Sequence, residues 1–251
     1  MIRADQLLVA RGLAPTRSTA QRLIDRGAVR WLGPGGWIAP RKAGERVPES
    51  CEIEVTDDAE LRYVSRGGLK LEGALARGGF DVRGLVCLDL GQSTGGFTDC
   101  LLRAGAARVV GIDVGHGQLH ESLRSDARVR AFEGLNVRTL DAAALGDAYP
   151  PGGFDLVVAD LSFIPLAHAF APAHALARPG TRLLALVKPQ FELGPGAVDG
   201  RGIVRDDALH AGLRERIERQ AHESGWIPAD WFDSPVTGGD GNREFFLMAR
   251  R

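Results

Sequence analysis

Five short apolar segments, each closed by a charged residue, recur from residue 85 onward and constrain the fold more than any other feature of the chain. Helical stretches separate these segments, which span residues 86–90, 109–113, 129–133, 156–160 and 183–188. Buried strands that alternate with crossover helices are typical of an open, doubly wound parallel sheet. Segments 227–232 and 244–248 are expected to add a last pair of strands. We therefore predict an α/β fold for this part of the chain.

The charged residues that close the five segments predict where a ligand binds. They are Asp89, Asp113, Glu133, Asp160 and Lys188. In open α/β sheets, ligands bind outside the carboxyl ends of the strands. Because parallel strands end at the same edge of a sheet, we expect these side chains to form an edge that holds a polar ligand.

The first segment runs into a glycine-rich turn, residues 89–97 (DLGQSTGGF), that is followed by a helix. Such a turn lets the backbone approach a ligand, and a helix N-terminus offers free N–H groups. The turn is not G-x-G-x-x-G, since Ser93 occupies the second glycine position, and it is not a P-loop, since Phe97 stands where that motif has Lys. These differences favour a nucleoside without a pyrophosphate, with Asp113 placed to accept hydrogen bonds from ribose hydroxyls.

The first 48 residues form a basic head with nine Arg or Lys against three acids, whereas the whole chain has a formal net charge of −1. Helices are expected over 5–11 and 17–26, with Thr16 as the cap of the second. A hairpin of 29–32 and 37–39 and a strand over 51–55 follow. A basic head on an acidic body indicates an anionic partner.

Several protein classes are disfavoured by the rest of the composition. The three cysteines, Cys51, Cys87 and Cys100, form no C-x-x-C pair, which argues against a disulfide framework or a zinc site. His116 and His120 lack the glutamate of H-E-x-x-H, so no metal is expected. No apolar run approaches the ~20 residues of a membrane span, and no signal peptide is evident. We expect a cytoplasmic protein.

Lysine is unusually rare in this chain. Of its 31 basic residues only Lys42, Lys70 and Lys188 are lysines. Where Arg supplies almost all positive charge, a retained Lys can do what Arg cannot, which is to lose its proton.

Six motifs in order along the chain resemble the TlyA family of ribosomal RNA 2′-O-methyltransferases. They are SRGGLKL (65–71), GQSTGGFTD (91–99), DVGHGQL (113–119), DLSFI (160–164), LVKPQFE (186–192) and GDGNREF (239–245). Proteins of this family join an S-four-type RNA-binding module to an FtsJ-like methyltransferase domain, and the resemblance covers essentially the whole chain.

The resemblance implies a Rossmann-like class I methyltransferase domain, with a mostly parallel seven-stranded sheet and helices on both faces, preceded by a small α+β RNA-binding domain. The expected boundaries are 1–60 for the RNA-binding domain, 61–66 for the linker and 67–251 for the methyltransferase domain.

The catalytic residues implied by the resemblance are a Lys-Asp-Lys-Glu tetrad, which the motifs map onto Lys70, Asp160, Lys188 and Glu244. Two of the three lysines belong to it. We assign Lys188 as the main base or hydroxyl-orienting group, because a neutral amine can accept the proton of a ribose 2′-hydroxyl. Lys70 is expected to favour that neutral form and to hold the ribose or phosphate, while Asp160 and Glu244 orient the lysines and compensate their charge.

The implied cofactor is S-adenosylmethionine. Its expected contacts are Asp89, Gly91, Ser93, Thr94, Gly95, Gly96, Phe97, Asp113, Glu133, Asn136 and Asp160. Gln92 and His116 depart from the small residues of the family pattern. RNA phosphates are expected to meet Arg17, Arg22, Arg26, Arg30, Arg41 and Arg66. Trp31 and Trp37 are expected in the core of the head rather than stacked on a base.

The resulting hypothesis is methyl transfer to a ribose 2′-hydroxyl, expected on a cytidine, of ribosomal RNA within ribosomal subunits. The enzyme is expected to be a monomer that needs neither a metal nor a membrane. Three alternatives stay open: a different acceptor RNA, a non-catalytic RNA-binding or ribosome-assembly factor, and a membrane-active haemolysin-like protein, since relatives carry that label.

Overall fold

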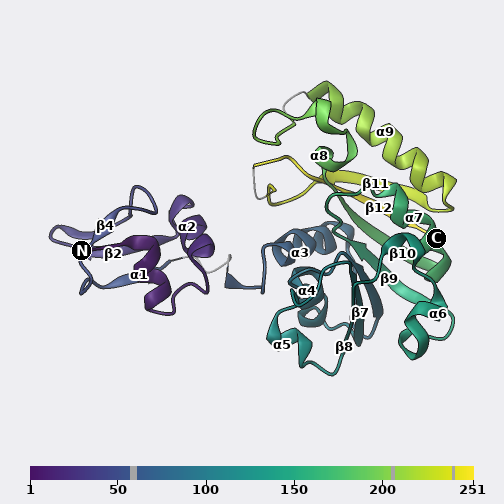
Figure 1. Cartoon of the computed structure of the whole chain (residues 1–251), viewed down its shortest axis with the longest axis horizontal. Helices are drawn as coiled ribbons and strands as arrows, with labels where there is room; N and C mark the ends of the chain where they lie inside the picture. Colours follow the sequence, from purple (N-terminus) through teal and green to yellow (C-terminus); the bar gives the residue numbers. More distant parts are fainter. Residues whose placement is uncertain (57–60, 205–206, 239–240) are drawn as a thin grey trace. The chain divides into compact units, whose positions relative to one another are not determined.

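The computed structural model describes residues 1–56, 61–204, 207–238 and 241–251. The chain divides into two compact units, Met1–Ser65 and Arg66–Arg251 (Figure 1). Residues 57–60 of the expected RNA-binding domain, and Gly239 and Asp240 of the last motif, lie outside the described residues.

The N-terminal unit packs two helices against small antiparallel sheets. Its elements are β1 (Ile2–Arg3), α1 (Ala4–Ala10), α2 (Arg17–Asp25), β2 (Val29–Gly33), β3 (Gly36–Ile38), β4 (Arg46–Val47) and β5 (Ile53–Val55). Strands β3, β2 and β5 form one sheet in that order, and β1 pairs with β4. Thr16 caps α2 by accepting a hydrogen bond from the backbone N–H of Thr19 at 3.2 Å, as the sequence predicted.

A buried carboxylate joins three elements of this unit. Asp5 on α1 has no exposed surface, and its oxygens accept hydrogen bonds from Arg3 at 2.8 and 2.9 Å, from Gln21 at 3.1 Å and from Arg17 at 3.4 Å. The hydrogen bonds from Arg3 are the main reason that the pKa of Asp5 lies well below its usual range. The carboxylate therefore ties β1, α1 and α2 together beside an apolar core that includes Leu8.

The larger unit is a seven-stranded sheet in the order β11-β12-β10-β9-β6-β7-β8. Its strands are β6 (Val86–Leu90), β7 (Arg108–Asp113), β8 (Val129–Glu133), β9 (Phe154–Ala159), β10 (Ala177–Val187), β11 (Ile227–Asp233) and β12 (Phe245–Arg250). Strands β8, β7, β6, β9 and β10 are parallel, and β12 runs antiparallel to both of its neighbours. This arrangement confirms the predicted mostly parallel α/β sheet.

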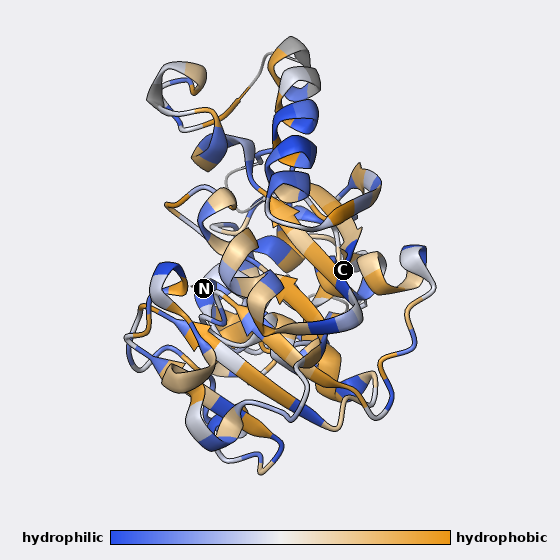
Figure 2. Ribbon diagram, turned by 90° about the vertical axis from the view of Figure 1, so that its right-hand side faces the viewer, coloured by the Kyte–Doolittle hydropathy of each residue, from blue (hydrophilic) through white to orange (hydrophobic). Residues whose placement is uncertain are grey.

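Helices cover both faces of this sheet, with α3, α4 and α5 on one and α6, α7 and α9 on the other (Figure 1). They are α3 (Gly67–Gly78), α4 (Gly96–Arg103), α5 (Glu121–Arg124), α6 (Ala142–Leu145), α7 (Ala167–Leu176), α8 (Pro189–Glu192) and α9 (Asp207–Glu223), with short 3-10 turns η2 (Val137–Thr139), η3 (Gly146–Ala148) and η4 (Pro195–Ala197). The strands are mostly apolar (Figure 2), because the helices remove both faces of the sheet from water.

Strand β10 begins six residues earlier than the expected segment 183–188. The sequence Arg178-Pro179-Gly180 reads as a turn, yet β10 begins at Ala177 and its pairing with β9 shifts register between Ala177 and Arg182. An irregularity of this kind accommodates proline and glycine within a strand. At the other end the strand stops at Val187, so that Lys188 follows it and caps α8.

Among the described residues, no helix is both long enough and apolar enough to cross a membrane.

Replacing the buried carboxylate of the N-terminal unit should loosen that unit. We expect Asp5→Asn to lower the free energy of unfolding at pH 7 by about 1–3 kcal/mol, because an amide cannot match the donors of Arg3 and Arg17. Hydrogen exchange should accelerate in peptides spanning α1 and α2. Since the pKa of Asp5 is depressed, wild type should lose this contribution on acidification below the ordinary carboxyl range. The exposed Asp25→Asn serves as the control, and equal protection in both variants would contradict the expectation.

Candidate active site

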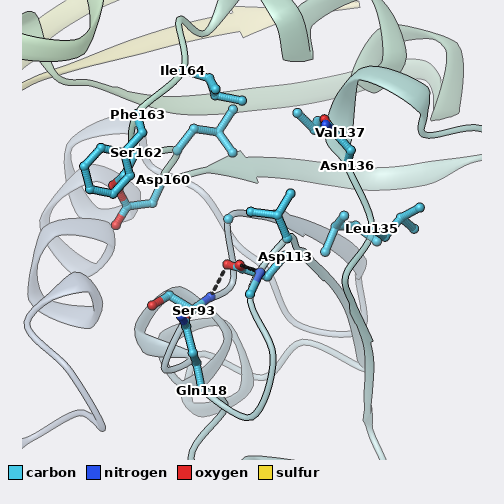
Figure 3. A pocket seen from close by; sticks show the side chains of 15 residues that line it. Ser93, Asp113, Gln118, Leu135, Asn136, Val137, Asp160, Ser162, Phe163 and Ile164 are labelled. Carbon is cyan, nitrogen blue, oxygen red and sulfur yellow. Dashed lines mark hydrogen bonds between the residues drawn. The ribbon is translucent and has the colours of Figure 1, made fainter.

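A cavity of about 340 Å³ lies at the carboxyl ends of β6, β7 and β9. Its walls include the apolar side chains of Ile112, Leu135 and Val137 and the carboxylates of Asp113 and Asp160 (Figure 3). The other lining residues are Gly91, Ser93, Val114, Gly115, Gln118, Asn136, Leu161, Ser162, Phe163 and Ile164. No described lining residue is Lys or Arg, so the cavity offers no cationic side chain to a pyrophosphate.

Gly91 brings two strand ends together beneath the cavity. Its φ of +84° is in the left-handed region, and a Cβ there would lie 2.5 Å from the backbone oxygen of Asp160. Only glycine meets both conditions without strain. The β6 and β9 strand ends are thereby held in contact, which brings Asp160 to the cavity wall.

Asp113 at the end of β7 fixes two loops of the cavity. Its Oδ2 accepts a hydrogen bond from the backbone N–H of Ser93 and its Oδ1 one from that of Gly115, both at 2.7 Å (Figure 3). Each carboxylate oxygen has a second lone pair, so Asp113 can still accept hydrogen bonds from the hydroxyls of a bound ribose.

The predicted cofactor residues fall into two groups. Gly91, Ser93, Asp113, Asn136 and Asp160 line the cavity, and the other six do not. Those six are Asp89, Thr94, Gly95, Gly96, Phe97 and Glu133.

Several residues of the second group shape the cavity from behind. Gly95, with a φ of +95°, starts α4 against Leu123, and the ring of Phe97 stacks on Phe246. Glu133 accepts a hydrogen bond from the backbone N–H of Gly117 at 3.0 Å, which steadies the loop after β7. Gly95 and Phe97 are buried within the turn and α4, whereas Glu133 is a partly exposed residue at the end of β8.

A buried polar chain runs beneath the glycine turn. Thr98 Oγ1 donates to Asp89 Oδ2 at 2.7 Å, and Gln92 Nε2 donates to Thr98 Oγ1 at 2.9 Å. Gln92 thus occupies space inside the fold, next to Gly111 of β7. Burial raises the pKa of Asp89 to about 7, and the nearby carboxylates of Asp160 and Asp113 add to the increase.

Two lysine–carboxylate pairs hold the four residues of the predicted tetrad. Lys188 Nζ lies 2.6 Å from Asp160 Oδ1, and Lys70 Nζ donates a hydrogen bond to Glu244 Oε2 at 2.5 Å. Lys70 and Glu244 are 8% and 3% exposed, so that pair is buried. Each lysine thus contacts a carboxylate.

Strand pairing explains how four residues so distant in sequence meet. Val187 of β10 pairs with Phe245 of β12 in antiparallel register, so the next position places Lys188 across from Glu244. Lys70 reaches Glu244 from α3. Asp160 follows β9, the parallel neighbour of β10 on its other side.

The predicted RNA-binding arginines occupy several elements. Arg17, Arg22 and Arg26 lie on or at the end of α2, and Arg17 also contacts Asp5. Arg30 on β2 pairs with Glu54 at 2.5 Å, and Arg41 is largely exposed near Glu45.

Arg66, in the larger unit, donates to the backbone oxygen of Thr237. Of the two tryptophans in the head, Trp31 packs against the core as expected. Trp37 differs from that expectation, since it is 40% exposed with the Arg30 guanidinium 4.8 Å from its ring centroid.

Sequence reasoning missed several residues that line the cavity. Ser162 and Phe163 lie two and three residues after Asp160, and Gln118 lies in the loop after β7. Their position just beyond charged strand ends is the signal that could have found them. Among the described residues, no group of three or more His, Cys, Asp or Glu side chains is arranged to hold a metal.

Comparison with known proteins agrees with this geometry. A family model described as FtsJ-like methyltransferase matches residues 63–251, and one described as S4 domain matches residues 2–30. The chain is 44% identical over 248 residues to the 16S/23S rRNA (cytidine-2′-O)-methyltransferase TlyA of Mycobacterium tuberculosis, covering 99% of this chain and 89% of that protein.

Two further similarities span nearly the whole chain. Hemolysin A of Brachyspira hyodysenteriae is 34% identical over 97% of this chain and 98% of its own length. A solved structure from Streptococcus thermophilus is 37% identical, with a TM-score of 0.75, and the match covers 99% of this chain and 88% of that one.

The buried Asp89 should give the protein a characteristic pH dependence of stability. Its raised pKa means that the folded chain keeps a proton that the unfolded chain releases, so the free energy of unfolding should fall as pH rises from about 4 to about 7. We expect Asp89→Asn, which preserves an acceptor for Thr98, to remove this loss and to be more stable than wild type above pH 7 by on the order of 1–3 kcal/mol. Urea unfolding from pH 4 to 8 measures the difference, and parallel pH profiles would contradict it.

Proposed function

The chain belongs to the FtsJ-like methyltransferase family, and we propose that it transfers a methyl group from S-adenosylmethionine to a ribose 2′-hydroxyl, on a cytidine, of ribosomal RNA. The observation that carries the proposal is the pair of lysine–carboxylate contacts beside a nucleoside-sized cavity. The substrate is supported by the relative in Mycobacterium tuberculosis and by the S4 domain match. We place this activity in the cytoplasm, in a monomer that needs no metal.

The lining of the cavity fits S-adenosylmethionine. Asp113 suits the two ribose hydroxyls, and Ile112, Leu135 and Val137 offer apolar contact to a purine ring. The carboxylates of Asp113 and Asp160 complement the positive charge of a sulfonium. When bound, S-adenosylmethionine supplies an electrophilic methyl group attached to that sulfur.

The task left to the protein is to orient the 2′-hydroxyl and to remove its proton. Lys188, in its neutral form, accepts that proton on Nζ. Asp160 then neutralises the ammonium that forms, since its oxygen lies 2.6 Å away. Lys70, held by Glu244, directs its remaining N–H groups toward the ribose or its phosphate. Fixing these groups in place contributes as much as the proton transfer itself.

The N-terminal unit binds the RNA. Arginines along α2 would neutralise phosphates, a contact that depends on salt and on RNA shape more than on base identity.

Methyl transfer should depend on Lys188 specifically as a lysine. With tritiated-methyl S-adenosylmethionine and purified ribosomal subunits, Lys188→Ala should lose about 10²-fold or more of the transfer rate. Lys188→Arg should be equally impaired, because arginine keeps its charge but does not lose a proton. Lys42→Ala, the remaining lysine outside the tetrad, should transfer at the wild-type rate. Nuclease digestion should recover the label as a 2′-O-methyl nucleotide.

Transfer to neither subunit, nor to 70S particles or free RNA, by a wild-type protein that binds the cofactor would refute the proposed reaction. RNA binding without transfer would then favour a non-catalytic assembly factor.

Arginines of α2 should contribute to RNA affinity through charge. We expect the double variant Arg22→Ala, Arg26→Ala to bind ribosomal RNA about tenfold more weakly at ~0.1 M salt, with a shallower dependence of affinity on salt. Cofactor affinity should stay unchanged. The matched control is Arg214→Ala, Arg219→Ala on α9. An unaltered salt dependence in the α2 variant would contradict the assignment.

A further inference from the structure

Ser162 makes a second polar contact with Lys188, the proposed base. It lies two residues after Asp160, in the loop that follows β9, and lines the cavity (Figure 3). Lys188 Nζ donates a hydrogen bond to Ser162 Oγ at 2.8 Å while it lies 2.6 Å from Asp160 Oδ1. The amine is thus in contact with two oxygens that come from the same loop. We propose that Ser162 is a positioning residue that aims the lone pair of Lys188 in the methyl transfer proposed above, on which this inference rests.

The argument follows from the valence of a neutral amine. Such an amine has two N–H bonds and one lone pair. Ser162 Oγ accepts the hydrogen bond that Lys188 Nζ donates, whereas Asp160 Oδ1 makes a 2.6 Å ion-pair contact without hydrogen-bond geometry. Ser162 therefore fixes one N–H bond and limits the directions open to the lone pair. With Asp160 alone, the amine can rotate about the Cε–Nζ bond and the lone pair sweeps a cone. A proton acceptor must be aimed to within about 10–20° for efficient transfer, which makes the hydrogen bond to Ser162 important.

After proton transfer the same contacts remain favourable. The ammonium formed on Lys188 has three N–H donors, of which one is directed at Ser162, while Asp160 balances its charge from 2.6 Å. Another carries the proton taken from the 2′-hydroxyl, and its loss to solvent restores the base. Ser162 only accepts a hydrogen bond from Lys188 in this scheme, so it undergoes no covalent change.

Two links hold the Ser162 loop against the segment that carries Lys188. Leu166, at the end of that loop, donates its backbone N–H to Glu192 Oε1 at 2.8 Å, and both residues are buried. Glu192 belongs to α8, which begins directly after Lys188. The rings of Phe163 and Phe191 make a second link, with centroids 5.0 Å apart. The Ser162 hydroxyl is therefore presented to Lys188 by a loop that is fixed at two points.

The rarity of lysine makes the positioning directly measurable. With ¹³Cε-lysine, the full-length protein should give three side-chain signals, which Lys42→Ala and Lys188→Ala assign. We expect the Lys188 Cε order parameter to be high in wild type, to fall in Ser162→Ala and to recover in Ser162→Thr, which keeps the hydroxyl. Ser224→Ala, a serine at the end of α9 that bonds to the backbone of Gln220, should leave it unchanged.

Turnover should follow the same pattern. We expect Ser162→Ala to lower kcat about tenfold, the factor that corresponds to one hydrogen bond, with KM for S-adenosylmethionine unchanged and with activity restored by Ser162→Thr. An unchanged Lys188 order parameter in Ser162→Ala overturns the inference, whether or not transfer is observed. An unchanged kcat in an active Ser162→Ala variant also overturns it. The proposed function fails separately, on the wild-type assay alone.

Discussion

The pairing of β12 with β10 is the constraint on which the candidate active site depends. The sheet is otherwise built from parallel strands, and this antiparallel contact brings a late segment of the chain back to the edge where the earlier strands end. Side chains alternate between the two faces of a strand, so a slip of one residue would reverse every side chain of β12. Glu244 would then leave Lys70, and a buried ammonium would lose its carboxylate. An intact site therefore requires the correct register of β12 against β10.

The two lysine–carboxylate pairs differ in the exposure of their carboxylates. Lys70 and Glu244 are almost completely buried, and burying two charges is costly unless they remain paired. That pair is thus held in one arrangement. Asp160 lines the cavity and its side chain is 21% exposed, whereas the side chains of Lys188 and Lys70 are similarly shielded, at 12% and 10%. The pair beside the cavity is therefore the one whose carboxylate is open to solvent.

Sequence reasoning captured the features that arise from periodicity and failed where packing decides. Apolar segments predicted the parallel strands, and Thr16 predicted the start of α2. Two-residue strands such as β1 were missed because they carry no periodic pattern. At the site, strand ends correctly indicated Asp113 and Asp160 as lining residues. The same logic placed Glu133 on the cavity wall, whereas its carboxylate binds the loop backbone. Which way a side chain points after a strand ends depends on the following turn, and spacing alone does not specify that.

The packing of Gln92 against Gly111 joins two positions from different strands. A Cβ on Gly111 would lie 2.0 Å from Gln92 Nε2, so a side chain there would displace the Gln92 amide from its hydrogen bond with Thr98. A chain with a small residue at position 92 would carry no such restriction at 111. The two positions are therefore expected to change together during divergence. A larger residue at position 111 is expected to occur with a smaller residue at position 92.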